Sequence, residues 1–526
     1  MNNTAAKVSQ DIIKKIYERT IFHFKAICGT YPRGSKKESG ICCFIKEFVN
    51  GLKEKGIDID LKHQSETREG KPINNIVITK PASKGYENAK KVALQAHLDM
   101  VCQKVEGSKH NFDTMPIKFE INGNLMTSEN KETTLGADDG IGIACIMAIL
   151  ESTELSHPQI QAVLTSDEED GMSGAKWLDT KLVDADCFIN IDAEEDGVLY
   201  YGCAGGIYAK TDIPVKYMPK PEDTVLLNFE ISGLLGGHSG IKIGNKHANA
   251  NRLMGRALNY FINDFSKTGD KIFLANISGG DVKNAITKKA SVVAAVKNNQ
   301  RKRFEKKAQE IEKIFKYEYG MLEQKLAVKT STCEDCYENV MSEETLKKII
   351  TMIMTVPNGV LDMYIGDKEL TGKLVETSSN LGIVKLNGTS VSVVCFVRSF
   401  IESKKRFAAE QIRLIAESIG AGFAVDTDFP EWNPDFDSGL VKLFKKTYKD
   451  IFDKELSCES IHAGLECGYF FKAFYNPQTQ KSADFVAVGP TLHDVHVPEE
   501  TLYLDTVEPL VALLLNVFAN MTAYSQ

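Results

Sequence analysis

The strongest constraint on the fold is an alternation of short apolar runs with helical segments in the first two hundred residues. Four runs are short, apolar and typical of buried strands: NNIVITK (74–80), KVALQAH (91–97), IQAVLTS (160–166) and CFINID (187–192). Before the third run, IGIACIMAILES (141–152) has no polar face and predicts a buried helix. This alternation predicts an α/β domain with a mixed, mostly parallel sheet and helices on both faces.

The pattern changes near residue 205. Strands with one polar face, such as VLLNFEISGL (225–234), then alternate with amphipathic helices such as NANRLMGRALNYFINDF (249–265), which predicts a two-layer α+β domain. Later helices are expected near 437–453 and 500–522, and no internal repeat is evident. A chain of 526 residues is too long for one core. We therefore expect a catalytic domain formed by 1–206 and 404–526, with the α+β domain inserted at 207–403.

The composition argues against several classes of protein. A net charge of −8 disfavours general affinity for nucleic acid or for an anionic membrane. No apolar stretch reaches the roughly 18 residues of a membrane span, and no secretory signal is evident. The 12 scattered cysteines suit free thiols in a reducing cytoplasm. One CxxC pair, Cys333 and Cys336, stands alone and is weak evidence for a metal or redox site.

Segments rich in His, Asp and Glu follow several of the predicted strands. They are AHLD (96–99), GADDG (136–140), SDEED (166–170), NIDAEE (190–195) and DVHVP (494–498). Each segment alone has an ordinary explanation, such as a helix cap for GADDG or a solvated acidic loop for SDEED. In open α/β sheets, however, sites gather beyond the carboxyl ends of the strands. Together, the five segments predict a metal site.

The chemistry of two-metal sites explains such a set. Imidazole and carboxylate groups are ligands that suit zinc, and Mn or Co would accept them too. One carboxylate must bridge the two ions, which lie about 3.5–4 Å apart, and another must stay free to take a proton from water. A ligating histidine usually donates its other N–H to a carboxylate. The pair His97 and Asp99 fits that arrangement.

The motifs also resemble a known family. HLDMV, TLGADDGIG, DEEDGMSGA, CAGG, GGHSG, HAGLECGYF and GPT…H-x-P are similar to peptidase D, the bacterial aminoacyl-histidine (Xaa-His) dipeptidases. These belong to the di-zinc metallopeptidases that include aminoacylases and carboxypeptidase G-type enzymes. The resemblance runs from about residue 10 to the C-terminus. It implies a catalytic domain with an inserted lid domain.

The resemblance implies a role for each polar residue of the series. The implied metal ligands are His97 and Asp192 for one ion, Glu169 and His496 for the other, and Asp138 for both. Asp99 would orient His97, and Glu168 would be the general base. The reverse order of Glu168 and Glu169 stays open. His493 competes with His496, which we prefer because Pro498 preserves the H-x-P pattern. The Asp138–Asp139 bond is often cis in this family.

The resemblance also implies substrate-binding residues in and near the inserted domain. His238, between glycines in GGHSG, would stabilise an oxyanion, and glycines would let its loop approach a substrate closely. Arg398 could hold a substrate carboxylate as a bidentate fork. Asn284 is a candidate hydrogen-bond donor to substrate. In HAGLECG, His462 and Glu466 are candidates for the substrate pocket.

We therefore expect a cytoplasmic dipeptidase with two divalent ions, zinc above all. Its expected substrates are small peptides of the Xaa-His type, such as carnosine, with broad specificity. A homodimer through the inserted domain is a family expectation. Two alternatives remain: an aminoacylase-type amidohydrolase of N-acyl amino acids, which would use the same ligands, and a non-catalytic metal-binding relative.

Overall fold

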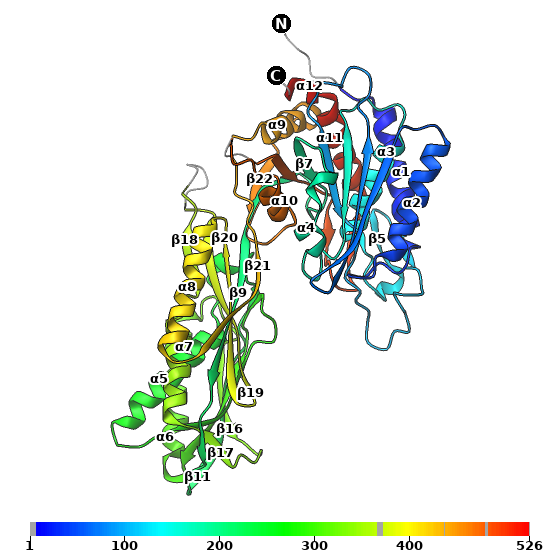
Figure 1. Ribbon diagram of the computed structural model, residues 1–526. Coiled ribbons are helices and arrows are strands. Elements are labelled where there is room, and N and C mark those ends of the chain that lie inside the picture. The colour runs from blue at the N-terminus through cyan, green and yellow to red at the C-terminus, as the bar shows by residue number, and fades with distance from the viewer. Residues whose placement is uncertain (1–6, 366–371, 436, 479–481, 525–526) are drawn as a thin grey trace. The chain divides into compact units, whose positions relative to one another are not determined.

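The computed structural model describes residues 7–365, 372–435, 437–478 and 482–524, and the chain divides into two compact units (Figure 1). Unit 1 comprises Met1–Gly202, Pro434–Ser460 and Leu465–Gln526; unit 2 comprises Cys203–Asn433 and Ile461–Gly464. Unit 2 is thus an insertion, as the sequence predicts. The expected return at residue 404 is wrong, because the helix over Glu402–Ser418 and the strand over Gly422–Phe429 both belong to unit 2.

Unit 1 is built on an eight-stranded sheet with the order β1-β2-β6-β3-β7-β23-β8-β22. The strands are β1 (Asp60–Arg68), β2 (Lys71–Lys80), β3 (Val92–His97), β6 (Ile160–Thr165), β7 (Cys187–Asn190), β8 (Val198–Cys203), β22 (Ser457–Ile461) and β23 (Asp484–Ala487). The central strands β6, β3, β7 and β23 run parallel, whereas β1, β2 and β8 pair antiparallel with their neighbours. The sheet is therefore mixed, with a parallel centre.

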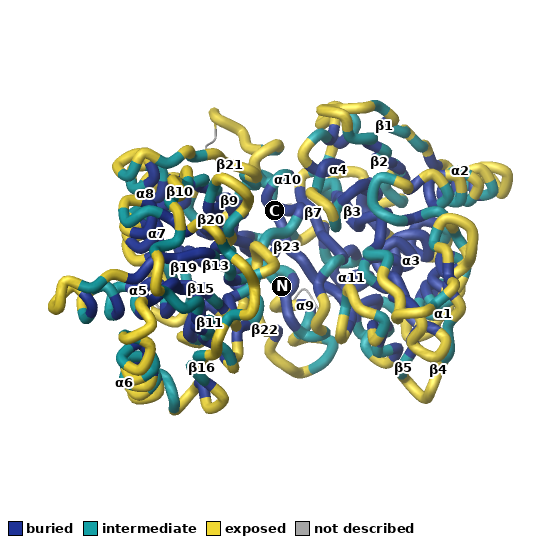
Figure 2. Tube along the Cα trace, turned by 90° about the horizontal axis from the view of Figure 1, so that it is seen from below, coloured by how far each residue is buried: buried dark blue, intermediate teal, exposed yellow. Residues whose placement is uncertain are grey.

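Helices cover both faces of this sheet. They include α1 (Gln10–Cys28), α2 (Ser39–Glu54), α3 (Ala137–Glu151), α4 (Ser173–Lys176), α9 (Gly439–Phe452), α10 (Cys467–Ala473), α11 (Val507–Ala519) and α12 (Met521–Tyr524). Figure 2 shows α10 and α4 on one side of β7 and β3, with α11 and α3 on the other. Every residue of α3 from Asp139 to Leu150 is buried, which agrees with its lack of a polar face. The buried sheet and α3 form the framework that presents the strand ends.

A small second sheet in unit 1 joins two distant parts of the chain. It has the order β24-β25-β5-β4 and contains β4 (Phe119–Asn122), β5 (Leu125–Ser128), β24 (Leu492–His493) and β25 (Thr501–Tyr503). Thr501 of β25 pairs with Thr127 of β5. The helix expected at 500–522 begins only at Val507, because β25 and a 3₁₀ turn occupy residues 501–506.

Unit 2 has two layers, a long antiparallel sheet and four helices packed on one of its faces. The sheet order is β16-β11-β15-β13-β19-β20-β9-β21, and β18 (Gly359–Met363) pairs with β19. The strands are β9 (Gly205–Pro214), β11 (Thr224–Ser232), β13 (Phe273–Gly279), β15 (Ala290–Lys297), β16 (Ala327–Thr332), β19 (Val375–Asn387), β20 (Ser390–Ser399) and β21 (Gly422–Phe429). The helices are α5 (Ala250–Ser266), α6 (Arg301–Tyr319), α7 (Glu343–Thr355) and α8 (Glu402–Ser418).

The two halves of this sheet repeat one topology. The first half runs β11-α5-β13-β15-α6-β16, and the second runs β9-α7-β19-β20-α8-β21. Counted outward from the middle of the sheet, each half has its second strand, then its third, its first and its last. This order is β13-β15-β11-β16 in the first half and β19-β20-β9-β21 in the second. The halves join where Ser278 and Gly279 of β13 pair with Lys385 and Val384 of β19, and α5 packs beside α7. The sequence did not reveal this repeat.

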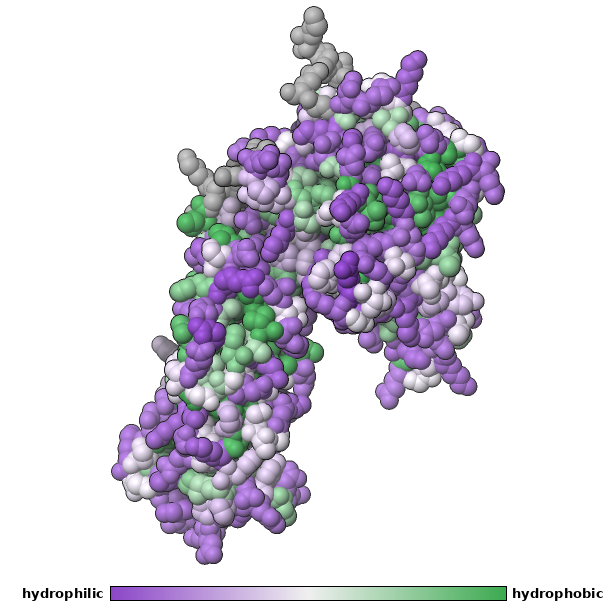
Figure 3. Space-filling view, viewed as in Figure 1, coloured by the Kyte–Doolittle hydropathy of each residue, from purple (hydrophilic) through white to green (hydrophobic). Residues whose placement is uncertain are grey.

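Among the described residues, no helix is both long and apolar enough to cross a bilayer. Hydrophilic side chains cover most of the face that Figure 3 shows. Neither Cys333 and Cys336 nor any other pair of the 12 cysteines forms a disulfide bond in the described structure.

A buried ion pair ties α8 to unit 2. Lys405 is only 1% exposed, and its Nζ donates to Glu431 Oε2 at 2.7 Å and to the carbonyl of Phe429 at 2.8 Å. These bonds connect α8 with the last residue of β21 and with the segment that follows it. They are part of the reason why unit 2 extends beyond residue 404.

We predict that Lys405→Met lowers the unfolding free energy of unit 2 by about 3 kcal/mol, because it leaves the Glu431 carboxylate buried without its cation. The chain has two tryptophans. In a Trp177→Phe background, the fluorescence of buried Trp432 therefore reports urea unfolding of unit 2 alone. Glu410→Gln, on the exposed side of the same helix, is the control and should leave the midpoint unchanged. Equal midpoints for Lys405→Met and its parent would contradict the prediction.

Candidate metal centre

The acidic and histidine residues singled out from the sequence gather at one edge of the unit 1 sheet. His97 is the last residue of β3, and Asp192 follows the neighbouring parallel strand β7. Glu168 and Glu169 follow β6, on the other side of β3. The carboxyl ends of parallel strands share one edge, which brings these side chains together. Asp138 joins them from the start of α3, and His496 from the loop between β24 and β25.

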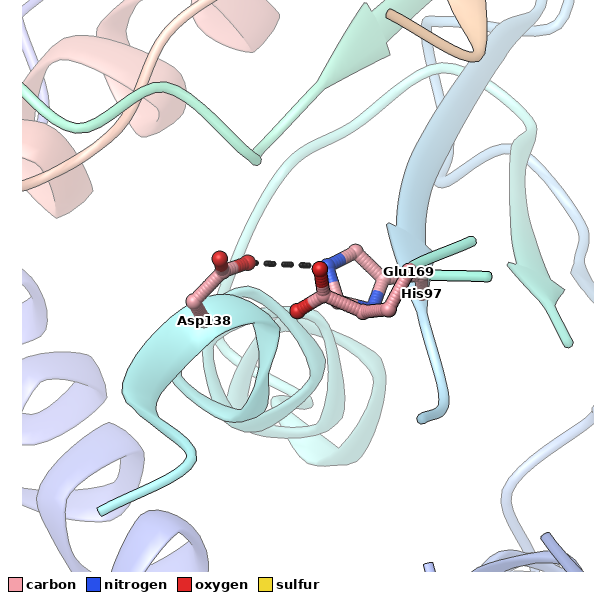
Figure 4. Close-up of side chains that lie close together, drawn as sticks. All are labelled: His97, Asp138 and Glu169. Atoms are coloured by element: carbon pink, nitrogen blue, oxygen red, sulfur yellow. Dashed lines mark hydrogen bonds and ion pairs between the residues drawn. The ribbon is translucent and has the colours of Figure 1, made fainter. Parts of the chain in front are cut away.

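Asp138 lies at the centre of the cluster. Its Oδ1 is 2.8 Å from His97 Nε2, and its Oδ2 is 3.0 Å from His496 Nε2. Figure 4 shows Asp138 projecting from α3 toward the imidazole of His97, with Glu169 beside it. The ligand atoms of these three residues lie within 4.8 Å of one another. One carboxylate therefore presents an oxygen to each of two imidazoles.

Two further carboxylates lie beside the two histidines. Asp192 is next to His97 and Glu169 is next to His496, so each histidine has its own carboxylate in addition to Asp138. Asp192 Oδ1 is 3.5 Å from His97 Nε2, and Glu169 Oε2 is 3.0 Å from His496 Nε2. The second oxygen of Glu169, Oε1, is buried without a hydrogen-bond partner among the described residues. His493, the competing histidine, instead lies against Tyr503, with its Nδ1 3.2 Å from the phenol oxygen. The structure thus brings His496 to the cluster, and not His493.

The crowding of carboxylates controls the protonation of the two histidines. Burial alone would lower the pKa of His97, but the carboxylates of Asp192, Asp138 and Asp99 raise it well above its ordinary value. Burial also opposes the protonation of His496, yet Asp138 and Glu169 raise its pKa to about 11. In the protein without ions, both imidazoles therefore carry the positive charge that the carboxylates require.

The carboxylates respond to the same forces. Burial raises the pKa of Asp138, but the two imidazoles more than offset it, and the pKa falls well below its ordinary range. Burial raises the pKa of Asp192 to about 6, against the effect of His97. A site with this excess of carboxylates over imidazoles is suited to bind cations.

The neighbours Glu168 and Glu169 face different surroundings. Glu169 lies against His496, as described above, whereas no side-chain hydrogen bond is found for Glu168 in the described structure. Burial raises the pKa of Glu168 well above its ordinary value, and the like charges of Glu169 and Asp192 add to the effect. Glu168 is therefore a carboxyl group that can hold a proton beside the cluster.

Asp99 connects His97 with the glutamate pair. Its Oδ1 is 3.5 Å from His97 Nδ1 and accepts the backbone N–H of Glu168 at 2.9 Å. Its Oδ2 accepts the N–H of Glu169 at 3.2 Å and the hydroxyl of Ser35 at 2.7 Å. Asp99 is fully buried, and these donors together with His97 lower its pKa although burial would raise it. One carboxylate thus fixes both glutamates relative to the histidine.

Sequence reasoning missed several residues that support the cluster. Ser35 bonds Asp99, as above, and Glu38 accepts the backbone N–H of Asp167 at 3.1 Å. Glu500, which is 2% exposed, accepts backbone N–H groups around Asp138. All three act through contacts with residues far away in the sequence. No local spacing or periodicity could have identified them.

In unit 2, His238 and Arg398 meet. His238 precedes α5 in the short strand β12 (Gly237–His238), and Arg398 lies near the end of β20. The Nδ1 of His238 accepts the N–H groups of Gly240 and Ile241 at 3.3 and 3.2 Å, so the neutral ring carries its proton on Nε2. That Nε2 is 3.4 Å from the Arg398 guanidinium. Burial, then the charge of Arg398, lowers the pKa of His238 to about 4.

Arg398 is a buried cation without a carboxylate partner in the described structure. It is 4% exposed, its Nε has no hydrogen-bond partner, and its guanidinium lies 4.0 Å above the ring of Phe396. Burial lowers its pKa to about 10. Arg398 and His238 Nε2 are both donors, so an anion could accept hydrogen bonds from both.

The three remaining candidates lie in different places. Asn284 is exposed in unit 2, where its backbone carbonyl accepts the N–H of Ser239 at 2.8 Å. His462 is buried in the same unit, with its Nε2 2.8 Å from Ser378 Oγ. Burial, then Arg398 and His238, lowers the pKa of His462 to about 3.

Glu466 is wholly buried in unit 1. Its Oε2 accepts from Thr165 at 2.6 Å and from Gln95 at 2.7 Å, beneath the ends of β6 and β3. Burial raises its pKa to about 8. Its carboxyl group is thus engaged with the strands that carry the cluster, and the expected contact with substrate remains a prediction.

Comparisons with known proteins agree with this fold and site. Residues 229–321 match the model of the peptidase dimerisation domain. The chain is 32% identical over 500 residues to the cytosol non-specific dipeptidase of Escherichia coli K12, across 95% of this chain and 97% of that protein. It is 31% identical to the aminoacylhistidine dipeptidase of Vibrio alginolyticus, whose crystal structure matches with a TM-score of 0.80 over 99% of this chain and 98% of that one.

A more distant structure shares the fold alone. A tripeptidase from Staphylococcus aureus matches with a TM-score of 0.54 at 15% identity, over 96% of this chain and 99% of that one. The high coverage and identity of the first two relatives decide the family. The chain belongs to the peptidase D family of M20 metallopeptidases, enzymes that hydrolyse peptide bonds.

Proposed function

We propose that this chain is a metal-dependent dipeptidase that uses two divalent ions, with zinc as the first candidate. The observation that carries the proposal is Asp138, whose two oxygens face the Nε2 atoms of His97 and His496. His97 and Asp192 would hold one ion, Glu169 and His496 the other, and Asp138 both. When bound, two such ions polarise a peptide carbonyl and lower the pKa of a water molecule.

The residues present fit such ions. Imidazole nitrogen and carboxylate oxygen are the donors that zinc prefers, and Mn or Co accept the same set. The buried, unpartnered Oε1 of Glu169 offers a further ligand atom. Each Nε2 atom now forms a hydrogen bond with an oxygen of Asp138. An ion would bind the same nitrogen and oxygen atoms, in place of the proton between them.

Glu168 is the proposed general base. Its backbone is held by Asp99, and its side chain makes no described bond with the five proposed ligands. A buried carboxyl group with a raised pKa can accept a proton from water and return it to a leaving amine. Asp99 would orient His97 while it holds both glutamates in place.

We propose that unit 2 supplies the groups that recognise the substrate's ends. The buried Arg398 guanidinium would pair with the α-carboxylate of a dipeptide, and the Nε2–H of His238 would stabilise an oxyanion. The absence of a carboxylate partner for Arg398 among the described residues supports this role. Asn284 and His462 remain candidates for further substrate contacts.

The names of the relatives support the substrate class. They are a cytosol non-specific dipeptidase and an aminoacylhistidine dipeptidase. We therefore propose dipeptides, including Xaa-His peptides such as carnosine, as substrates, and a cytoplasmic location. The matched dimerisation domain supports a homodimer through unit 2. N-acyl amino acids are the alternative substrates that assays must include.

We predict that Glu168→Gln lowers kcat for a dipeptide by at least about 100-fold while two ions remain bound, because it removes only the proton acceptor. Hydrolysis of carnosine, Gly-His and N-acetyl-methionine, with metal counted by atomic emission, tests this. The matched variant Glu169→Gln should instead lose an ion. If Glu168→Gln loses metal and Glu169→Gln keeps it, the two roles are exchanged.

We predict that Arg398→Ala lowers kcat/KM for dipeptides by about tenfold to a hundredfold, because a charge-assisted bond to the carboxylate is lost. The same variant should change kcat/KM little for the corresponding dipeptide amides, which have no carboxylate. Arg413→Ala, at an exposed position of α8, is the control. Equal losses for dipeptides and their amides would exclude carboxylate recognition by Arg398.

We predict that Zn²⁺ binding to the metal-free protein at pH 7 releases about two protons, because both ligating imidazoles are protonated before the ions bind. The neighbouring carboxylates raise the pKa of His97 well above its ordinary value and that of His496 to about 11, so these protons are bound before the ions and must leave. Calorimetric titrations in buffers of different ionisation enthalpy measure the release. His496→Gln should release about one proton fewer, whereas His493→Gln should match the wild type. The opposite result would make His493 the ligand.

A further inference from the structure

Glu500 makes an unusual set of contacts directly before β25. Its buried carboxylate accepts four consecutive backbone N–H groups. Oε2 accepts from Leu135 at 2.8 Å and Gly136 at 2.9 Å, and Oε1 accepts from Ala137 at 2.7 Å and Asp138 at 3.3 Å. Both oxygens of one side chain are thus committed to the turn that begins α3.

The turn at residues 135–138 needs such a partner. The first N–H groups of a helix have no acceptor within the helix, and the positive end of the helix dipole favours an anion there. Here the anion does not come from the preceding residues, because Gly136 has no side chain to cap with. Glu500 supplies it from another part of the chain.

The opposite side of the same turn is held by Arg33. Its NH1 donates to the carbonyl of Gly136 at 3.1 Å, and its Nε and NH2 donate to the carbonyls of Leu98 and Asp99 at 3.2 and 3.3 Å. A Cβ on Gly136, which has φ 71°, would approach Arg33 NH1 to 2.7 Å. The turn therefore lies between an arginine that binds the carbonyl of Gly136 and a glutamate that binds its N–H groups.

Glu500 also belongs to the segment that carries His496. Only three residues separate them, and β25, which begins at the next residue, is paired with β5. Asp138 and His496 are 358 residues apart in the sequence, yet their side chains lie 3.0 Å apart. The four bonds of Glu500 join the backbone of one segment to the other at that point.

We infer that Glu500 is a positioning residue that sets Asp138 relative to His496 and so fixes the spacing of the two ion sites. The inference rests on the proposed function. Glu500 makes no described contact with the ligand atoms of the cluster; it acts through the backbone N–H of Asp138. Loss of Glu500 should weaken the binding of the ion held by Asp138, Glu169 and His496 more than the binding of the ion held by His97.

The decisive variant is Glu500→Gln, which keeps the shape of the side chain but removes its charge. It also turns one acceptor oxygen into an amide nitrogen that faces N–H donors. The matched control is Glu499→Gln, which changes the neighbouring, exposed glutamate in the same way. Glu500→Asp is a second variant, because it keeps the charge but is one methylene shorter.

The measurement is a titration of the folded, metal-free proteins with Zn²⁺ in competition with a chromophoric chelator. For Glu500→Gln we expect one site with wild-type affinity and a second site weakened about 10- to 100-fold, the usual effect of losing a supporting hydrogen bond. KM for the dipeptide should stay unchanged when zinc is in excess. Glu499→Gln should bind both ions as the wild type does.

Two results would overturn the inference. One is that Glu500→Gln binds both ions with wild-type affinity, even if its melting temperature falls; Glu500 would then only stabilise the fold. The other result concerns Glu500→Asp and is needed if Glu500→Gln does not fold. Wild-type affinity at the second ion site of Glu500→Asp would also show that Glu500 only stabilises the fold. Weaker binding at that site would support the inference. A wild type that binds two ions but cleaves no dipeptide would refute the proposed function and not this role of Glu500.

Discussion

The carboxylate of Asp138, held between the Nε2 atoms of His97 and His496, is the interaction around which unit 1 is arranged. It joins the end of a central strand, the start of a buried helix and a loop from the last part of the chain. A carboxylate that faces two imidazoles must be placed accurately on all three sides. The surrounding hydrogen bonds serve that placement, and they come mainly from buried charged groups.

Each of these supporting groups binds the backbone of a different part of the cluster. Asp99 binds the N–H groups of Glu168 and Glu169, and Glu500 binds those around Asp138. Asp139, which follows Asp138 across a cis peptide bond, accepts the N–H of His97 at 3.2 Å. Each carboxylate is buried at a cost that its hydrogen bonds must offset. The result is a cluster whose geometry is set by backbone contacts before any ion binds.

The sequence predicted the parts of this arrangement that are local. The runs at 91–97 and 160–166 match β3 and β6 to within a residue, because fully buried strands carry a continuous apolar pattern. The cis bond at Asp138–Asp139, expected from the family resemblance, is present. For Glu500 the sequence instead predicts a helix, because the three residues of β25 are too few to show a strand pattern. Its partners are backbone N–H groups more than 360 residues away, and such contacts leave no trace in spacing.

The repeated topology of unit 2 bears on how copies of this chain could assemble. The half that matches a peptidase dimerisation domain already has its inner edge strand, β13, paired with β19 of the second half. That edge has no backbone groups left to offer at Ser278 and Gly279. The outer strands of the sheet are β16 and β21, so a second chain that extends the sheet at either end would pair with one of them.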